Sequence, residues 1–346
     1  MKNLFLSFTL LLMLCSCVTT KLTDQNVPRN SVNSANSTSF IVIGDMPYSD
    51  KELLMLSQPN GSIYNAIRRK KPAVLIHYGD LKSAGESCTD KLLLARRELL
   101  FNLNPYKIVY TPGDNGWTDC DKNTVQIKFD ELERLHFIRE HFYRGEGEKL
   151  TRDLKGIIRQ ENFIENAMWT IDQLKLATLH VPGTNNGREH IYESDIEDAL
   201  DEADRRDYYN ELWLNKLFSE ANSASAVVII FQADIYHVKS TTPDVECTPN
   251  LRVDCDGFKR IREQIKDKAM LYKKPVLVIH GDTNAYCLQQ QAAKEAKYLW
   301  RLNGPGDYKL SDAAHVVFDV NNTNAPFSVQ TLLKGNSFPA ICDYSR

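Results

Sequence analysis

Short apolar runs that lead into an aspartate recur along the chain. There are five, FIVIG, VLIHYG, KIVYTPG, VVIIFQA and PVLVIHG, and the aspartates that follow them are Asp45, Asp80, Asp114, Asp234 and Asp282. Each run is rich in β-branched or aromatic residues and is bounded by glycine, proline or polar residues, which is typical of a buried strand. A further run, LKLATLH, ends in His180. The pattern therefore predicts six buried strands.

Amphipathic segments separate several of these runs. Apolar residues at helical spacing predict helices over 91–100, 130–143, 196–220 and 258–272. Strands that alternate with helices indicate an α/β fold with a largely parallel or mixed sheet. In such a sheet ligands bind outside the carboxyl ends of the strands, so the five aspartates have a common place to meet.

The convergence of these aspartates predicts a metal site. A single aspartate after a strand is most often a turn residue or a helix N-cap. Several carboxylates at one edge repel one another and resist ionisation unless a cation lies among them. The sequence contains no P-loop, dinucleotide-binding loop, Gly-x-Ser-x-Gly elbow or His-Glu-x-x-His motif. We therefore expect a cation site rich in oxygen ligands.

The amino terminus has the pattern of an exported lipoprotein. A lysine precedes a short apolar run over 4–14, which ends in Leu14-Cys15-Ser16-Cys17 and resembles a bacterial lipobox. We expect a signal peptide over 1–16, a lipid on Cys17, a Ser/Asn/Thr-rich flexible tether over 17–38 and a folded domain over 39–346. The alternative is a plain signal peptide with two chance cysteines. The lipoprotein reading places the chain in the bacterial cell envelope, held to a membrane on its periplasmic or surface side.

Six cysteines remain after such processing, an even number that permits three disulfides in an oxidising compartment. Cys247 and Cys255 flank a short polar loop and are the simplest pair. Cys88 and Cys120 follow strand ends at the same sheet edge, so we expect them to pair, which leaves Cys287 with Cys342. The rival interpretation is a metal site, but the mature chain has no Cys-x-x-Cys pair.

Composition excludes several classes of protein. The 346 residues are 42% hydrophobic and 25% charged, which is ordinary globular composition and excludes a collagen-like, coiled-coil or wholly disordered chain. The 42 basic residues are outnumbered by 45 acidic ones, so the chain has no broad cationic footprint for nucleic acid. A catalytic or binding domain remains.

Six sequence blocks, taken in order, resemble the calcineurin-like metallophosphoesterases, in particular an exported bacterial branch. The blocks are GDMPY at 44–48, HYGDLKSAGESCTD at 77–90, YTPGDNGWTDC at 110–120, LATLHVPGTNNG at 176–187, FQADIY at 231–236 and HGDTNAY at 280–286. The resemblance implies a four-layer α/β/β/α sandwich of two mixed β-sheets flanked by helices, with two metal ions at one edge.

The same resemblance implies a set of site residues. Asp80 matches the aspartate that bridges both metals, Asn115 falls at the position of the catalytic histidine, and the remaining ligand positions are taken by Asp45, Asp114, Gln232, Asp282 and Asn284. The chain departs from the family in its histidines. The usual Asp-x-His of the first motif is Asp45-Met46-Pro47 here, and no histidine stands at any expected ligand position. Asn115 cannot transfer a proton at neutral pH, so His180, His280 or a water would supply the acid.

Two functions follow from these residues. The first is a metal-dependent phosphoric ester hydrolase acting on mono- or diesters. Its carboxylate and amide ligands favour Mg²⁺ or Mn²⁺ over Zn²⁺ or Fe, and also suit Ca²⁺. The second is a catalytically degenerate lipoprotein of the same fold that acts as a binding or structural module. His77 and His280 lie inside apolar runs and are expected in the core. Trp117, Tyr48 and the 185–187 loop either line a substrate or simply pack.

Overall fold

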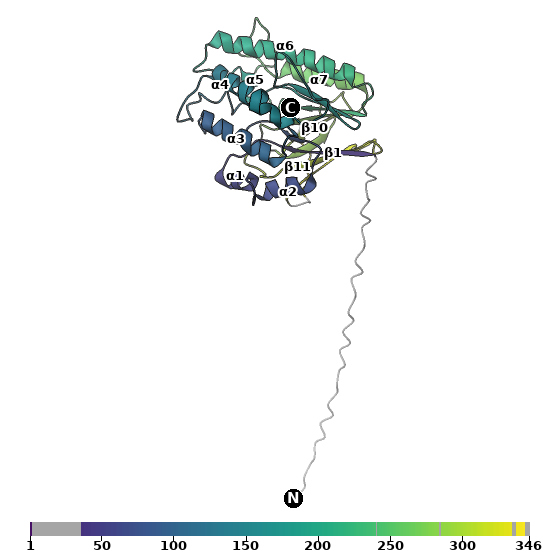
Figure 1. Cartoon of the computed structure of the whole chain (residues 1–346). Helices are drawn as coiled ribbons and strands as arrows, with labels where there is room; N and C mark the ends of the chain where they lie inside the picture. Colours follow the sequence, from purple (N-terminus) through teal and green to yellow (C-terminus); the bar gives the residue numbers. More distant parts are fainter. Residues whose placement is uncertain (2–35, 240, 284, 334–336, 343–346) are drawn as a thin grey trace. The chain divides into compact units, whose positions relative to one another are not determined.

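Two mixed β-sheets form the centre of the fold (Figure 1). The computed structural model describes residue 1 and residues 36–239, 241–283, 285–333 and 337–342. All of its strands and helices belong to the unit Ser34–Arg346. The predicted lipidation site Cys17, the signal peptide over 1–16 and the predicted ligand Asn284 lie outside the described residues.

Each sheet combines a parallel centre with antiparallel strands. The first sheet has the order β12 (Phe327–Thr331), β11 (Ala314–Asp319), β1 (Ser37–Ile43), β2 (Leu75–His77) and β3 (Ile108–Tyr110). The second has the order β4 (Ile158–Arg159), β5 (Ala167–Ile171), β6 (Leu174–Thr178), β7 (Ala226–Ile230), β8 (Val276–His280), β10 (Leu299–Asn303) and β9 (Cys287–Gln290).

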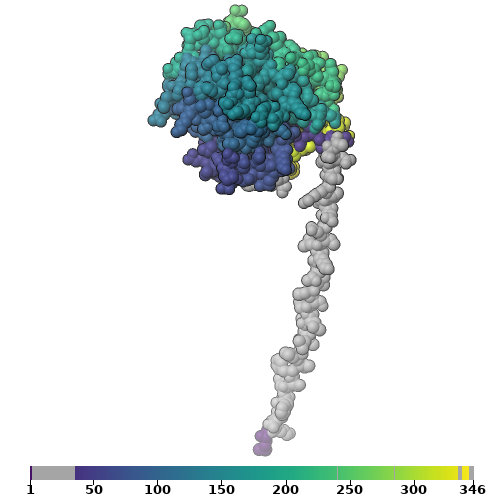
Figure 2. All heavy atoms as spheres, viewed as in Figure 1, coloured from purple at the N-terminus to yellow at the C-terminus, as the bar shows by residue number. Residues whose placement is uncertain are grey.

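Helices cover the outer faces of both sheets. They are α1 (Asp50–Leu56), α2 (Ser62–Lys70), α3 (Asp90–Leu103), α4 (Glu131–Ile138) with its π-helical extension η1 (Arg139–Tyr143), the 3₁₀ turn η2 (Gly145–Thr151), α6 (Ile196–Glu220) and α7 (Lys259–Tyr272). The short turn α5 (Gly183–Gly187) instead follows β6, where Gly183 contacts Gln232. In the space-filling view α1 and α2, in purple, lie at one end of the folded unit, and α6, in teal to green, lies at the other (Figure 2).

Three separate apolar clusters show that these elements form four layers. One cluster joins the outer face of the first sheet to α1–α4, through residues such as Ile41 and Leu100. The second lies between the two sheets and contains Phe40 and Trp169. The third packs the outer face of the second sheet against α6 and α7, with Leu217 as one contact. The predicted α/β/β/α sandwich is thus the observed fold.

The parallel strands place their carboxyl ends along one edge of the sandwich. In the first sheet Ile43, His77 and Tyr110 lie at the same level of β1, β2 and β3. In the second sheet β6, β7, β8 and β10 run parallel to one another. Both sheets therefore deliver their strand-end loops to a shared edge, where a ligand site is expected.

The amino-terminal boundary differs slightly from the prediction. The tether was expected to extend to residue 38, but β1 begins at Ser37. Ser37 and Thr38 pair with Asp319 and Phe318 of β11, and Thr38 also donates to Asp172 Oδ2 at 3.1 Å. Backbone pairing does not depend on apolar side chains, so two polar residues extend the strand. Within the described part of the chain, no helix is long and apolar enough to cross a bilayer.

The structure confirms all three predicted disulfides. They join Cys88 to Cys120, Cys247 to Cys255 and Cys287 to Cys342. The first connects the segment after β2 to the segment after β3, and the third ties the carboxyl-terminal segment to β9.

Candidate metal centre

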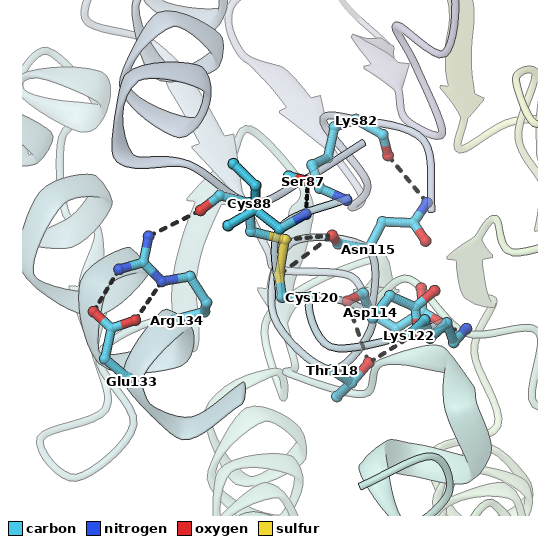
Figure 3. Close-up of a disulfide and its surroundings, with 12 residues drawn as sticks. Lys82, Ser87, Cys88, Asp114, Asn115, Thr118, Cys120, Lys122, Glu133 and Arg134 are labelled. Carbon is cyan, nitrogen blue, oxygen red and sulfur yellow. Dashed lines mark hydrogen bonds and ion pairs between the residues drawn. A yellow bond between two sulfur atoms is a disulfide. The ribbon is translucent and has the colours of Figure 1, made fainter. Parts of the chain in front are cut away.

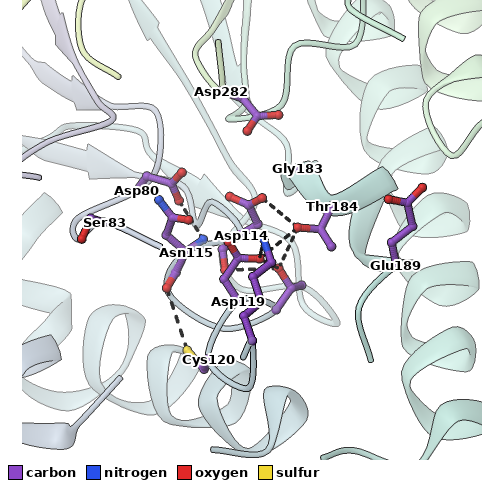
Figure 4. Close-up of polar contacts among 12 residues, drawn as sticks. Asp80, Ser83, Asp114, Asn115, Asp119, Cys120, Gly183, Thr184, Glu189 and Asp282 are labelled. Atoms are coloured by element: carbon purple, nitrogen blue, oxygen red, sulfur yellow. Dashed lines mark hydrogen bonds and ion pairs between the residues drawn. The ribbon is translucent and has the colours of Figure 1, made fainter. Parts of the chain in front are cut away.

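Three carboxylates from both sheets meet at the shared strand edge. Asp80 follows β2, Asp114 follows β3 and Asp282 follows β8, and one oxygen of each lies within 4.8 Å of the others. Asp80 and Asp114 are buried, and Asp282 is partly buried. Figure 4 shows Asp282 pointing toward the pair formed by Asp80 and Asp114. A fourth carboxylate, Asp45, adjoins them, because its Oδ2 accepts the Asp282 backbone N–H at 3.2 Å.

The backbone at these aspartates adopts a conformation that most residues avoid. Asp45, Asp80 and Asp282 have positive φ angles of 49°, 57° and 67°. Aspartate is among the side chains that tolerate this left-handed region, and strained backbone of this kind is concentrated at functional sites. Gly281 is needed beside them, since a Cβ there would lie 1.8 Å from Asp45 Oδ2.

The carboxylates resist ionisation in this arrangement. Burial raises the pKa of Asp45, Asp80 and Asp282 well above the ordinary value, and the neighbouring carboxylates raise it further. A divalent cation among them would oppose both effects, because it interacts favourably only with the ionised form.

Gln232 presents its amide nitrogen to the cluster. Its Nε2 donates to Asp80 Oδ2 at 2.9 Å, to Asp114 Oδ1 at 3.2 Å and to Asp282 Oδ1 at 3.0 Å. Its Oε1 accepts the backbone N–H of Gly183 at 2.6 Å. A backbone N–H can only donate, so the amide oxygen must face Gly183 and the nitrogen must face the carboxylates. The resemblance placed Gln232 at the position of a metal ligand, where only its amide oxygen could bind a cation, whereas the structure turns the amide nitrogen toward the carboxylates.

Tyr48 and Asn115 close the other side of Asp80. The Tyr48 hydroxyl lies 3.2 Å from Asp80 Oδ2 and 3.4 Å from Asp45 Oδ1. Asn115 donates its backbone N–H to Asp80 Oδ1 and its amide to the Tyr48 hydroxyl and to the Lys82 carbonyl, each at 3.1 Å. Asn115 therefore positions Tyr48 and Asp80, and its amide has no proton to transfer at neutral pH.

The carboxylate donor set fits a hard divalent cation. Converging carboxylate oxygens are the ligands that Mg²⁺, Mn²⁺ and Ca²⁺ prefer, and Asp45, Asp80, Asp114 and Asp282 would hold such an ion. Gln232 does not fit as an oxygen ligand in its present orientation. Of the predicted ligands, Asp45, Asp80, Asp114, Gln232 and Asp282 thus converge, with Gln232 in a different chemical role.

Three further polar residues near the cluster were not predicted from the sequence. Asp119 is buried, and burial together with Asp114 raises its pKa to about 6. Lys82 is fully buried, and burial lowers its pKa to about 8 although Asp80 opposes this shift. Asp307 donates its backbone N–H to the Asp45 carbonyl at 3.1 Å. The sequence does contain a pattern that could predict Asp307, because the segment LWRLNGPG before it has an interrupted apolar run followed by a glycine- and proline-containing turn.

His77, His180 and His280 have no described contact with the three carboxylates, whereas Asp234 lines the same cavity as Asp114 and Asp282 and raises the pKa of Asp282. His180 is fully buried, its Nδ1 lies 2.8 Å from Glu165 Oε1, and its ring packs against Trp117. Among the described contacts, none joins its ring to a carboxylate of the cluster. His280 is buried 3.7 Å from Asp234, and His77 is buried beside Met46. These placements match the core role expected for His77 and His280, and they leave His180 without a contact that would carry acid catalysis.

His180 leads to a prediction on acid stability. Burial lowers its pKa from 6.5 to about 4. A histidine whose pKa is lower in the folded state stabilises the fold fully above pH 6.5, and this contribution is lost as the pH falls toward 4. The loss amounts to about 3 kcal/mol. In His180→Gln, which keeps a donor for Glu165, the free energy of unfolding should fall less steeply between pH 6.5 and 4.

Urea unfolding at a series of pH values measures this slope. Exposed His136→Gln is the control, since that ring is in water in both states, and its slope should equal the wild-type slope. An unchanged slope in His180→Gln would contradict the prediction.

A cavity of about 260 Å³ opens beside the cluster. The strand-end residues Asp114, Asp234 and Asp282 line it, and Lys122, His237, Lys239 and Phe258 are among its other lining residues. Lys122 lies 2.5 Å from Asp119. Burial lowers the pKa of Lys122, but Asp119, Asp114 and Asp80 together raise it above its ordinary value, so this ammonium stays charged at the cavity wall.

Comparison of the chain with models of protein families and with curated proteins found no match.

Proposed function

We propose that the chain is a metal-dependent phosphoric ester hydrolase held at the bacterial envelope by a lipid on Cys17. One observation carries the hydrolase proposal: Asp80, Asp114 and Asp282 come from both sheets and bring their oxygens within 4.8 Å of one another. The resemblance of the six sequence blocks supports the same reaction class, and the strand-edge position is where this kind of fold binds its ligands.

The residues at the edge have separable roles in this reaction. A bound divalent cation would supply an activated water and neutralise charge on phosphorus oxygens. Asp45, Asp80, Asp114 and Asp282 hold the cation. Lys122 offers a positive charge to the phosphate or to the departing oxygen from the cavity wall. The cavity beside Asp114 and Asp282 receives the rest of the ester.

A second candidate function is a binding or structural module of the same fold. The orientation of Gln232 favours it, because one protein amide donates to all three carboxylates. Asn115 at the position of the catalytic histidine favours it as well. In this case the cation would bind weakly and no ester would be hydrolysed.

Metal analysis and an activity panel separate the two functions. The full chain, freed of metal with chelator, is titrated with Mg²⁺, Mn²⁺, Ca²⁺ and Zn²⁺ and assayed on aryl phosphate mono- and diesters. The hydrolase predicts saturable binding of a hard cation and hydrolysis that depends on it. Binding without hydrolysis of any ester would favour the module.

A further inference from the structure

Two protein hydrogen-bond donors divide the carboxylates of the cluster between them. The Tyr48 hydroxyl lies between Asp45 and Asp80, and the Gln232 amide lies among Asp80, Asp114 and Asp282. Asp80 is shared by both donors, through its Oδ2. We call the Tyr48 hydroxyl and the Gln232 amide nitrogen the internal donors.

The surrounding contacts fix the direction of both donors. Asn115 donates its amide to the Tyr48 oxygen, so the single Tyr48 hydrogen is left for the carboxylates. Gly183 donates its backbone N–H to Gln232 Oε1, so the Gln232 amide cannot reverse without setting two donors against each other. Each internal donor therefore supplies partial positive charge to carboxylates that burial and mutual repulsion destabilise.

We propose that the internal donors stabilise the metal-free cluster and compete with divalent cations for the same carboxylate oxygens. Gln232 and Tyr48 would then set the affinity of the site for cations, because a cation must take oxygens that these donors already use. This inference deepens the proposed function and rests on it for the identity of the competing ligand.

Removing the donors one at a time tests the proposal. In Gln232→Glu, one carboxylate oxygen still accepts from Gly183 and the other faces the cluster as an additional ligand. Tyr48→Phe removes the hydroxyl and keeps the ring that packs on Tyr308 at a centroid distance of 4.8 Å. Both metal-free variants should have a lower Tm than the metal-free wild type, and both should bind Mn²⁺ more tightly, with Gln232→Glu gaining about tenfold or more.

Differential scanning fluorimetry of metal-free and Mn²⁺-loaded full chain, together with calorimetric titration, gives both quantities without an activity assay. Gln160→Glu is the matched control, since Gln160 is also buried but hydrogen-bonds to Asn166 and Tyr209. Its metal-free Tm should fall, while its Mn²⁺ affinity should stay at the wild-type value.

The outcomes separate the proposal from the proposed function. If the wild type binds Mn²⁺ and both Gln232→Glu and Tyr48→Phe bind it with the same affinity, the proposed competition by the internal donors is wrong. The hydrolase proposal then still stands. If neither the wild type nor either variant binds Mn²⁺, both the competition by the internal donors and the hydrolase proposal are wrong. Binding by Gln232→Glu alone supports the internal donors and counts against hydrolysis by the wild type.

Discussion

Asp80→Asn is expected to weaken divalent-cation binding by more than about tenfold, or ~1.4 kcal/mol. Asp80 is the carboxylate that contacts both Tyr48 and Gln232, so it borders both halves of the cluster. The asparagine oxygen can keep the hydrogen bond from the Asn115 backbone N–H, which preserves the loop. The other atom becomes an uncharged amide nitrogen, which cannot ligate a cation.

Calorimetric titration with Mn²⁺ measures this loss, and any phosphoesterase rate should fall further because the attacking water depends on the bound cation. Asp172→Asn is the control, since Asp172 shares the positive φ of Asp80 but lies beside Thr38, at the start of β1. Wild-type Mn²⁺ affinity in Asp80→Asn would refute a cation site at this cluster.

Replacing Cys88 and Cys120 together by serine should lower the free energy of unfolding by about 4 kcal/mol in the chain-entropy model. The bridge closes a segment with a sequence separation of 32 residues. It also joins the loop of Asp80 to the loop of Asp114, and both sulfurs lie near the Asn115 carbonyl (Figure 3). Loss of the bridge should therefore weaken cation binding as well, because the two loops are no longer tied together.

Chemical unfolding and Mn²⁺ titration of the double variant test both effects. The matched control replaces Cys247 and Cys255, whose separation is 8 residues, and should cost only about 2 to 3 kcal/mol. Equal losses for the two double variants, or unchanged Mn²⁺ affinity without the Cys88–Cys120 bridge, would contradict the prediction.

The sequence predicts the parallel strands of the fold better than the antiparallel ones. β7 and β8 are buried on both faces and appear as continuous apolar runs. β11 alternates buried and partly buried residues, and β12 includes an exposed serine, so neither forms such a run. The two-layer arrangement of sheets came from the family resemblance, because no local pattern states which strands share a sheet.

The sequence predicts the carboxylates of the candidate site but not the hydrogen bonds that join them. The strand-end aspartates meet because the carboxyl ends of parallel strands lie at one edge of the sheet. The sequence pattern predicts this, since it shows an aspartate after each of five apolar runs. The orientation of Gln232 depends on the backbone N–H of Gly183, 49 positions away, and no local pattern reports it. Asp307 follows β10, whose apolar run is interrupted by Arg301 and Asn303, so the pattern of apolar runs does not predict it.

The carboxyl-terminal segment covers the edge strand β9 of the seven-stranded sheet. β9 is the last strand of that sheet, and its outer side is occupied by residue 340, since Leu288 N–H donates to the Ala340 carbonyl at 2.9 Å and Ala340 N–H donates to the Tyr286 carbonyl at 3.1 Å. The Cys287–Cys342 bridge holds this segment in place. An uncovered outer strand is a template for intermolecular pairing and aggregation. Reduction of the bridge is therefore expected to free the segment that covers β9 and to make the folded chain more prone to aggregate.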